Sequence, residues 1–537
     1  MITDRIRKIV ADNADRTAVK VGAETISYAE LWRRAKEVGD FLRRQGTSPV
    51  VLRGEHCIDE MTALAACLVA RRAYVPVGAH VPEGRFREIL SATGATLVLT
   101  FAKNGTADLA ASPAANSSAF PAQDSEVEVL TLSELSKYRD CEVLQNDNET
   151  AYIIFTSGST GTPKGVPVSY GNLENFTKWI AGLSPLSEYR GAKVLNQASL
   201  SFDLSVADVY YALCGGHTWV AQADGFAASA LTKTQVFSEE GINVAVLTPS
   251  GLKLCLLEET FDAKTIPSLR AVFCCGERLE KKTVRKLFAR FPDIAMINAY
   301  GPTEATCAVC AVQITREMLD ADAELPVGDP ANAATEIFVC DPVNPEDAGE
   351  QGDCGGDASG REQSACGDGA RGGGGEIILR GASVFSGYLD GRAGGHFTSG
   401  GVNGYRTGDG GFLRDGLLYC TGRRDNQIKY KGYRIETDEI ECRILRLPGV
   451  AECAVVAPVN AAGIVKTIRA YVVADATESC SGALAEQRVC GELTADEVRS
   501  GLAETLPPYM IPKTIEIVGS LPRNNNGKID RKALVEL

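Results

Sequence analysis

The chain has 537 residues, a formal net charge of −14, 45% hydrophobic residues and 23% charged residues. This length exceeds what one hydrophobic core usually serves, and the composition is that of a soluble globular enzyme, so we expect two or more domains. The acidic balance argues against nucleic acid as the main partner. No apolar run is long enough to cross a bilayer, and residues 1–10 show no signal-peptide pattern. We therefore predict no membrane insertion and a cytoplasmic location.

The first 150 residues alternate between helical and extended patterns. Apolar spacing predicts helices over residues 28–44 and 60–71, and extended runs predict strands over 73–77 and 96–100. The stretch 104–125 is rich in Ala, Ser and Asn, which predicts an exposed loop.

A glycine-rich loop follows an apolar run over residues 151–155, which predicts a buried strand. Small residues let backbone N–H groups converge on one anion. The loop also carries hydroxyls and ends in Pro163-Lys164-Gly165, which adds a positive charge. We predict a phosphate site, although the Gly-Lys-Ser/Thr ending of the Walker pattern is missing. The alternative, a flexible linker, is disfavoured because linkers rarely follow a buried strand so directly.

Between residues 152 and 312 a strand, a loop and a helix repeat. Strand-like runs at 194–197, 244–248, 271–275 and 296–299 alternate with helical runs at 202–213, 250–258 and 279–290. This order predicts an α/β fold in which helices cover largely parallel sheets. Ligands bind beyond the carboxyl ends of such strands, which is where the polar loops of this region lie.

The C-terminal part changes pattern after residue 425. A hairpin is predicted over 427–436 around Lys431-Gly432, followed by the helices and strands of a small α+β domain. We predict a large domain over 1–424 and a small C-terminal domain over 425–537, with the hinge at Asp425. Two polar stretches, about 341–374 and 479–492, are predicted to be surface insertions.

The 17 cysteines are scattered, odd in number and mostly within apolar runs, which indicates reduced thiols in the core. Cys307 and Cys310 have Cys-x-x-Cys spacing. A zinc site needs a second pair of ligands, and the four histidines do not cluster in the sequence. A buried strand is therefore favoured over a metal or redox role.

Seven motifs occur in one order along the chain: 156–165, 202–205, 298–304, 405–409, 422–425, 431–436 and 526–528. On this ordered set the chain resembles the adenylate-forming superfamily of acyl-CoA synthetases, luciferases and peptide-synthetase adenylation domains. Within it the chain most resembles D-alanine–D-alanyl carrier protein ligases, on residues 201–206, 275–277, 285–292, 298–306, 313–320 and 527–534.

This resemblance implies that D-alanine is activated by ATP to an adenylate and passed to the phosphopantetheine thiol of an acidic D-alanyl carrier protein, for teichoic acids. A stand-alone adenylation enzyme for another small amino acid, feeding a peptidyl carrier protein, is the alternative. A regulatory protein without turnover is disfavoured by Lys528, Glu304 and Asp409, and an acyl-CoA synthetase is disfavoured by Asp203.

The resemblance also assigns the nucleotide site. The implied ATP-binding residues are Thr156, Ser157, Gly158, Ser159, Thr160, Gly161, Lys164, Asn298, Ala299, Tyr300, Gly301, Pro302, Thr303, Asp409, Arg423 and Lys528. Tyr300 would stack on the purine, and Asp409 would accept hydrogen bonds from the ribose hydroxyls. Glu304 would hold Mg²⁺, which needs only one or two protein oxygens when phosphates and water complete its shell.

Lys528 is the predicted catalytic residue and is also assigned to the substrate site. A substrate carboxylate must attack the α-phosphate, and two unit charges about 4 Å apart repel by ~4 kcal/mol at an effective dielectric near ~20. A lysine that bridges the two groups would offset this repulsion in the transition state. Without the Asn526-Gly527-Lys528 motif, the residue would be an ordinary surface lysine.

The amino-acid site is predicted from Asp203, whose carboxylate can pair with the ammonium group of the substrate. The competing interpretation is a helix N-cap before residues 204–213. The side-chain pocket is implied to be lined by Leu204, Cys275 and Cys307. Cys307 stands where related ligases commonly have Val, a change that hardly alters the volume.

The small domain is implied to rotate at Asp425 after adenylation, which would withdraw Lys528 and present Lys431-Gly432-Tyr433 to the pantetheine arm. Five basic residues near the hinge could steer an acidic carrier protein or simply form a solvated hairpin face. They are Arg423, Arg424, Lys429, Lys431 and Arg434.

Overall fold

The structure is a computed structural model. It describes the chain apart from residues 1, 55, 102–127, 133, 135–147, 159, 223–224, 226–230, 322–323, 341–373, 426, 461–462, 476–492, 524–528 and 537. The predicted loop 104–125, nearly all of the two predicted insertions, Ser159 and Lys528 lie outside the described residues.

The described residues include an eight-stranded sheet. Its spatial order is β14 (Cys310–Ile314), β13 (Ala295–Tyr300), β12 (Ala271–Cys274), β11 (Val244–Leu247), β9 (Lys193–Leu195), β10 (Thr218–Ala221), β1 (Thr17–Val21) and β2 (Glu24–Ser27). Neighbours from β13 to β1 pair in parallel, and the two edge strands pair antiparallel. The predicted parallel sheet is confirmed.

A six-stranded sheet carries the predicted phosphate loop. Its order is β6 (Glu128–Leu130), β5 (Leu97–Thr100), β3 (Val50–Gly54), β4 (Tyr74–Gly78), β7 (Thr150–Thr156) and β8 (Lys164–Ser169). All pairs are parallel except β7 with β8, where Thr156 lies opposite Lys164. The glycine-rich loop is thus the turn of a β-hairpin, which brings its hydroxyl end and its lysine side by side.

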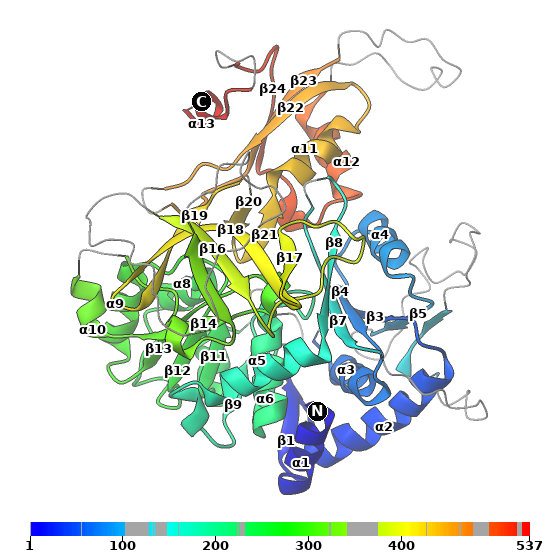
Figure 1. Cartoon of the computed structure of the whole chain (residues 1–537), viewed down its shortest axis with the longest axis vertical. Coiled ribbons are helices and arrows are strands. Elements are labelled where there is room, and N and C mark those ends of the chain that lie inside the picture. Colours follow the sequence, from blue (N-terminus) through cyan, green and yellow to red (C-terminus); the bar gives the residue numbers. More distant parts are fainter. Residues whose placement is uncertain are drawn as a thin grey trace.

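Helices cover both sheets (Figure 1). They are α1 (Ile2–Asp12), α2 (Tyr28–Arg44), α3 (Ile58–Ala70), α4 (Glu83–Thr93), α5 (Tyr170–Gly182), α6 (Leu204–Gly215), α7 (Lys233–Glu240), α8 (Pro249–Leu257), α9 (Lys281–Arg290) and α10 (Arg316–Asp320). The apolar helices α3 and α6 are buried along almost their whole length and share one core with both sheets. Gly216 ends α6 in the left-handed conformation, as a helix stop requires.

A third, antiparallel sheet was not predicted from the sequence. It consists of β15 (Glu336–Cys340), β16 (Gly375–Arg380), β17 (His396–Ser399), β18 (Val402–Arg414) and β19 (Leu417–Arg423). The long strand β18 contains four glycines. Glycine has no side chain, so the alternation of apolar and polar residues that marks a strand cannot be seen in this stretch of the sequence. This sheet places Asp409 directly opposite Arg423.

The small C-terminal domain has its own apolar core. Its elements are β20 (Gln427–Tyr430), β21 (Tyr433–Glu436), α11 (Thr437–Leu445), β22 (Val450–Val456), β23 (Arg469–Ala474), α12 (Ala495–Ala503), β24 (Thr514–Ile517) and α13 (Arg531–Glu536). The predicted hairpin is confirmed: Lys431 and Gly432 both have positive φ, as a two-residue hairpin turn demands. The exact domain boundary and the hinge at Asp425 stay predictions.

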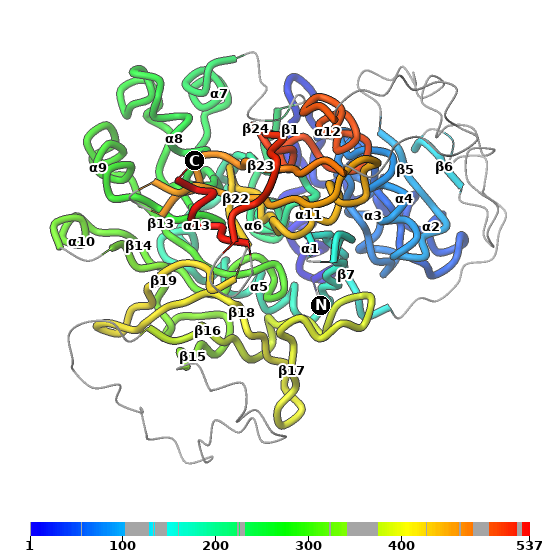
Figure 2. The backbone as a smooth tube through the Cα atoms, turned by 90° about the horizontal axis from the view of Figure 1, so that it is seen from above, coloured from blue at the N-terminus to red at the C-terminus, as the bar shows by residue number. Residues whose placement is uncertain are grey.

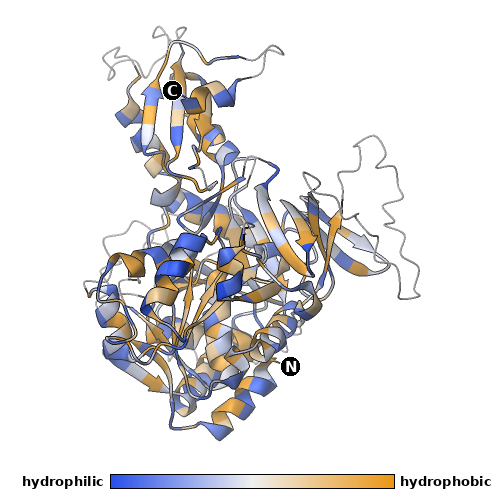
Figure 3. Ribbon diagram, turned by 90° about the vertical axis from the view of Figure 1, so that its left-hand side faces the viewer, coloured by the Kyte–Doolittle hydropathy of each residue, from blue (hydrophilic) through white to orange (hydrophobic). Residues whose placement is uncertain are grey.

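The small domain stands over the junction between the large-domain sheets (Figures 1 and 2). Apolar residues lie along the strands inside each domain, and polar residues lie on the outer helices (Figure 3). Among the described residues, none of the helices has both the length and the apolar character needed to cross a membrane.

Candidate active site

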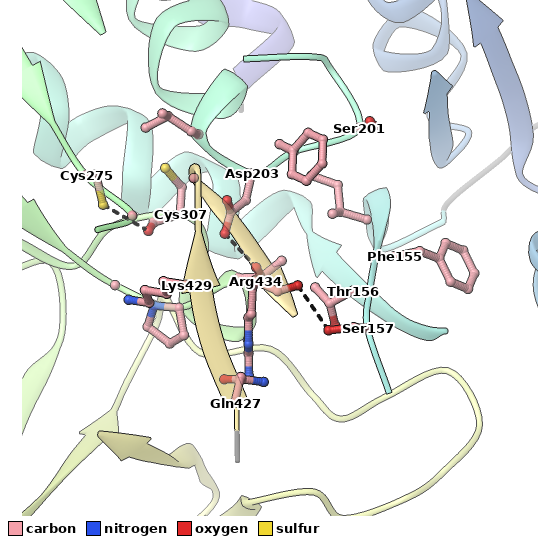
Figure 4. A pocket seen from close by; sticks show the side chains of 18 of the residues that line it. Phe155, Thr156, Ser157, Ser201, Asp203, Cys275, Cys307, Gln427, Lys429 and Arg434 are labelled. Atoms are coloured by element: carbon pink, nitrogen blue, oxygen red, sulfur yellow. Dashed lines mark hydrogen bonds between the residues drawn. The ribbon is translucent and has the colours of Figure 1, made fainter. Parts of the chain in front are cut away.

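A pocket lies where strand ends of the large domain meet the β20–β21 hairpin (Figure 4). The predicted site residues that line it are Thr156, Ser157, Asp203, Leu204, Cys275, Gly301, Pro302, Thr303, Cys307, Asp409 and Arg423. The small domain contributes Gln427, Lys429, Gly432, Arg434, Tyr509 and Met510. The pocket therefore joins residues from both domains.

Asp203 is in the N-cap position of α6, but its carboxylate does not cap the helix. Its backbone is already helical, and its side chain makes no capping hydrogen bond. Instead Asp203 Oδ2 accepts a hydrogen bond from Thr303 Oγ1 at 2.6 Å. Burial raises the pKa of Asp203, and the Thr303 bond counteracts part of this rise. Asp203 thus takes the N-cap position without making the capping bond, and its carboxylate lines the pocket.

The wall beside Asp203 contains two buried thiols. Cys275 Sγ lies 4.0 Å from the carbonyl oxygen of Cys307. Burial raises the pKa of Cys275 to about 12 and that of Cys307 well above its usual value, so both stay neutral and behave as small apolar groups. The predicted strand includes Cys310, which begins β14. Cys307 instead lies in the preceding turn with φ of 71°.

Asp409 lies at the other end of the pocket. Tyr300 donates a hydrogen bond to Asp409 Oδ2 at 2.7 Å, and Arg423 Nη1 lies 3.3 Å from Oδ1. Arg423 also pairs with Asp425, the predicted hinge residue. Tyr300 does not itself line the pocket, whereas its neighbours Gly301 and Pro302 do.

Asn298 and Ala299 lie behind this wall on β13. The Asn298 amide donates to the Pro326 carbonyl at 2.7 Å. In this structure these two residues support the wall without lining the pocket.

Glu304 lies in the short 3₁₀ helix Thr303–Ala305 and is fully buried. Tyr388 donates to Glu304 Oε1 at 2.6 Å, and Arg434 forms an ion pair with Oε2. Burial alone would raise the pKa of Glu304, but the charge of Arg434 lowers it to about 2. The carboxylate is therefore ionised, which is the form that could hold Mg²⁺. In this orientation both of its oxygens already have partners, Tyr388 and Arg434.

The phosphate loop is contacted by the small domain rather than left open. Ser157 Oγ donates to the Arg434 carbonyl at 3.0 Å and accepts from the Glu436 N–H at 2.9 Å. The Gly158 N–H donates to Glu439 at 3.0 Å, and Lys164 Nζ lies 2.9 Å from Glu436. Two carboxylates thus bind donors that the sequence assigned to phosphate.

The far side of the loop also lies against the small domain. A Cβ on Gly161 would lie 2.7 Å from Cys442 Cβ of α11, so only glycine fits there. Thr160 Oγ1 is 3.2 Å from Arg392 Nη1.

Gly432 marks the deepest contact of the hairpin. Its N–H donates to Glu277 at 2.6 Å, and a Cβ there would lie 2.8 Å from Thr248. The sequence did not single out Glu277, although it lies within the Cys275-Gly276-Glu277 segment. Arg85 and Tyr509 also line the pocket and were missed, because neither lies within one of the seven sequence motifs.

The predicted basic patch needs correction in this orientation. Arg423 and Arg434 pair with carboxylates inside the site. Lys429 Nζ lies 6.0 Å from the centre of the Tyr300 ring. Arg424 and Lys431 are the exposed members.

Lys528 lies outside the described residues, whereas the residues that flank its segment in the sequence are described. Arg523 and Ile529 bridge to each other, and Arg523 pairs with Glu452 of the small domain at 2.8 Å. None of the described residues after Met510 lines the pocket. Among the described residues of the small domain, those that line the pocket belong to the hairpin, together with Tyr509 and Met510.

Comparisons with known proteins place the chain in a family. Residues 6–389 match the model of the AMP-binding enzyme, and residues 439–528 match that of the AMP-binding enzyme C-terminal domain. The chain belongs to the AMP-binding enzyme family.

Curated relatives place it further within that family. It is 33% identical to the D-alanine–D-alanyl carrier protein ligase of Listeria monocytogenes serovar 1/2a, over 99% of this chain and 98% of the relative. It is also 33% identical to the ligase of that name from Bacillus licheniformis, over 100% and 99%. The resemblance inferred from the motifs is confirmed.

Solved structures agree on the fold. The Vibrio cholerae adenylation domain AlmE, in complex with glycyl-adenosine-5′-phosphate, matches with a TM-score of 0.78 and 24% identity over 100% of this chain and 97% of that one. PA1221, a protein with adenylation and carrier domains, matches with 0.76 and 23% over 100% and 84%. At these identities the likeness shows the fold alone.

Proposed function

We propose that this enzyme activates D-alanine with ATP to D-alanyl-adenylate, releases pyrophosphate, and transfers the D-alanyl group to the phosphopantetheine thiol of a carrier protein. The observation that carries the proposal is the Asp203 carboxylate, which faces a small pocket beside Cys275 and Cys307. An ammonium group can pair with this carboxylate, and the neutral thiols leave room for a short side chain. The similarity to ligases of that name supports D-alanine as the substrate.

The first half-reaction would use the phosphate loop with Lys164 for the β- and γ-phosphates and Asp409 for the ribose. Lys528 would approach from the small domain and bridge the attacking carboxylate and the α-phosphate. Glu304 suits Mg²⁺ once Arg434 has moved away, because it is an ionised carboxylate and the phosphates can supply further oxygens. Mg²⁺ would neutralise charge on the departing pyrophosphate.

The second half-reaction would use the orientation seen here, with the hairpin in the site. The thiol attacks the acyl carbon, the acyl–phosphate bond breaks, and AMP leaves. The exposed Arg424 and Lys431 could attract an acidic carrier protein. The proposal extends to teichoic acid D-alanylation in the cytoplasm, the role that the resemblance to D-alanine–D-alanyl carrier protein ligases implies.

The test is ATP–pyrophosphate exchange driven by D-alanine, with L-alanine and glycine as comparisons. D-Alanine is expected to support the fastest exchange. Equal exchange with L-alanine, or faster exchange with glycine or a larger amino acid, would contradict the substrate assignment. Exchange with none of them would contradict adenylation of small amino acids.

The pH dependence of amino-acid binding should follow Asp203. Burial raises the pKa of Asp203, so the carboxylate becomes protonated at a higher pH than an ordinary aspartate. A protonated Asp203 cannot pair with the ammonium group. The KM for D-alanine in the exchange assay is therefore expected to rise as the pH falls, and the Asp203→Asn variant should bind weakly at every pH. A KM that is flat with pH in the unmodified enzyme would contradict the pairing.

A further inference from the structure

Two ion pairs of opposite polarity join helix α4 of the large domain to helix α11 of the small domain. Arg85 Nη1 lies 2.6 Å from Glu439 Oε1, and Arg443 Nη2 lies 2.6 Å from Glu88 Oε2. Each helix supplies one cation and one anion. We call these four residues the α4–α11 clasp.

The clasp is largely buried. The Glu439 side chain is 0% exposed and that of Arg85 is 5% exposed, whereas Glu88, at the edge, is 29% exposed. Breaking a buried ion pair is strongly unfavourable when one charge stays buried. Rotation of the small domain would separate both pairs between the domains. Each helix would then keep one cation and one anion three or four positions apart, a weaker pairing than the buried one.

The clasp also touches the phosphate loop. The second carboxylate oxygen of Glu439 accepts the Gly158 N–H at 3.0 Å. Close packing continues beside the ion pairs: a Cβ on Gly84 of α4 would lie 3.0 Å from the Glu504 carbonyl oxygen of the small domain. One face of the small domain thus packs against both α4 and the phosphate loop.

We propose that Arg85, Glu88, Glu439 and Arg443 are positioning residues for the transfer half-reaction. They hold the small domain in the orientation that keeps Gly432 against Glu277 and Arg434 on Glu304. This inference rests on the proposed function, in which adenylation needs a different orientation. The clasp then favours transfer and contributes nothing to adenylation.

The test uses charge reversal at the edge of the clasp, away from the pocket. Glu88→Arg places two cations face to face, Arg443→Glu places two anions, and the double variant restores one pair with the signs exchanged. The control is Glu83→Arg, on the same helix with the same charge change, because Glu83 pairs with Arg53 and Arg87 inside the large domain. Two rates are measured: ATP–pyrophosphate exchange with D-alanine, and transfer from D-alanyl-adenylate to pantetheine.

Each single reversal is expected to slow transfer by roughly tenfold or more. The exchange rate is expected to stay within about twofold of that of the unmodified enzyme, because the reversal can also change how much of the protein is in each orientation. The double variant should recover most of the transfer rate, as a charge pair does in a double-mutant cycle. The Glu83→Arg control should leave both rates near those of the unmodified enzyme. Since Arg443 is buried, thermal unfolding checks that each variant folds, and Glu88→Arg is the primary variant. The clasp is overturned if Glu88→Arg leaves transfer unchanged, slows both rates alike, or is not rescued.

A readout without catalysis separates this inference from the proposed function. Trypsin cleavage after Arg424, next to the predicted hinge, should be faster in Glu88→Arg and slower again in the double variant, because undocking frees the linker. If the unmodified protein shows no D-alanine-dependent exchange while cleavage follows the clasp, the proposed function fails and the docking role stands. If the charge reversals change neither the cleavage rate nor the transfer rate, the proposal that the clasp positions the small domain is wrong.

Discussion

Replacing Lys528 with alanine is expected to lower D-alanine-dependent ATP–pyrophosphate exchange by ~10²–10³-fold. The lysine is the proposed cation between two mutually repelling anions, and removal of one preorganised donor from a developing charge typically costs on the order of 10²–10³ in rate. ATP binding should persist, because the phosphate loop, Asp409 and the pocket wall are untouched. Exchange and equilibrium ATP binding measure the two effects separately.

Transfer should respond differently to the same change. Because the proposed function assigns Lys528 to adenylation alone, Lys528→Ala should transfer D-alanine from synthetic D-alanyl-adenylate to pantetheine at nearly the unmodified rate. Lys532→Ala is a matched control, since Lys532 is an exposed lysine four residues further on. Unchanged exchange in Lys528→Ala would remove this residue from the mechanism. An equal loss of both half-reactions would indicate a structural role.

The parallel sheets could be predicted because their strands are short, buried and separated by helices with clear ends. Strand β11 lies within its predicted run 244–248, and Gly216 ends α6 where the sequence has its glycine pair. The antiparallel sheet could not be predicted in the same way. Strand β18 has glycines at positions 404, 408, 410 and 411, which leave no side chains to show a period of two.

The residues of the site also fall into two groups, those that short motifs predict and those that contacts between the domains bring together. Short motifs predicted Asp203, Thr303 and Asp409, because each lies in a segment on which the family resemblance rests. The structure places Asp409 in β18 and Thr303 at the start of a 3₁₀ helix. Domain contacts leave no such signal, since they join residues far apart in the sequence: Arg434 and Glu304 are separated by 130 positions and Arg85 and Glu439 by 354. The sequence could place Arg434 on a basic hairpin, but only the docked structure shows that it neutralises the predicted metal ligand.

The ion pair between Arg434 and Glu304 gives the second prediction of a large effect on rate. Replacing Arg434 with methionine is expected to slow transfer to pantetheine by ~10²–10³-fold, with adenylation largely retained. In the docked orientation Glu304 would remain a fully buried carboxylate without its cation, and breaking a buried pair in this way costs about 3–5 kcal/mol. The small domain would then spend little time docked. In the adenylation orientation Arg434 is expected to be away from Glu304, so exchange does not need it.

The pH behaviour and two further variants sharpen this prediction. The charge of Arg434 lowers the pKa of Glu304 from 4.5 to about 2 against the effect of burial. The pair therefore stabilises the docked state fully above about pH 4.5 and loses that effect as the pH falls toward 2. Arg434→Lys keeps the charge and should recover part of the transfer rate. Arg424→Met removes an exposed arginine of the same hinge region, and it should change neither exchange nor transfer to free pantetheine, because no carrier protein is present. If Arg434→Met slowed exchange as much as transfer, the Arg434–Glu304 ion pair would not distinguish the two orientations. The prediction that this pair acts in transfer alone would then be contradicted.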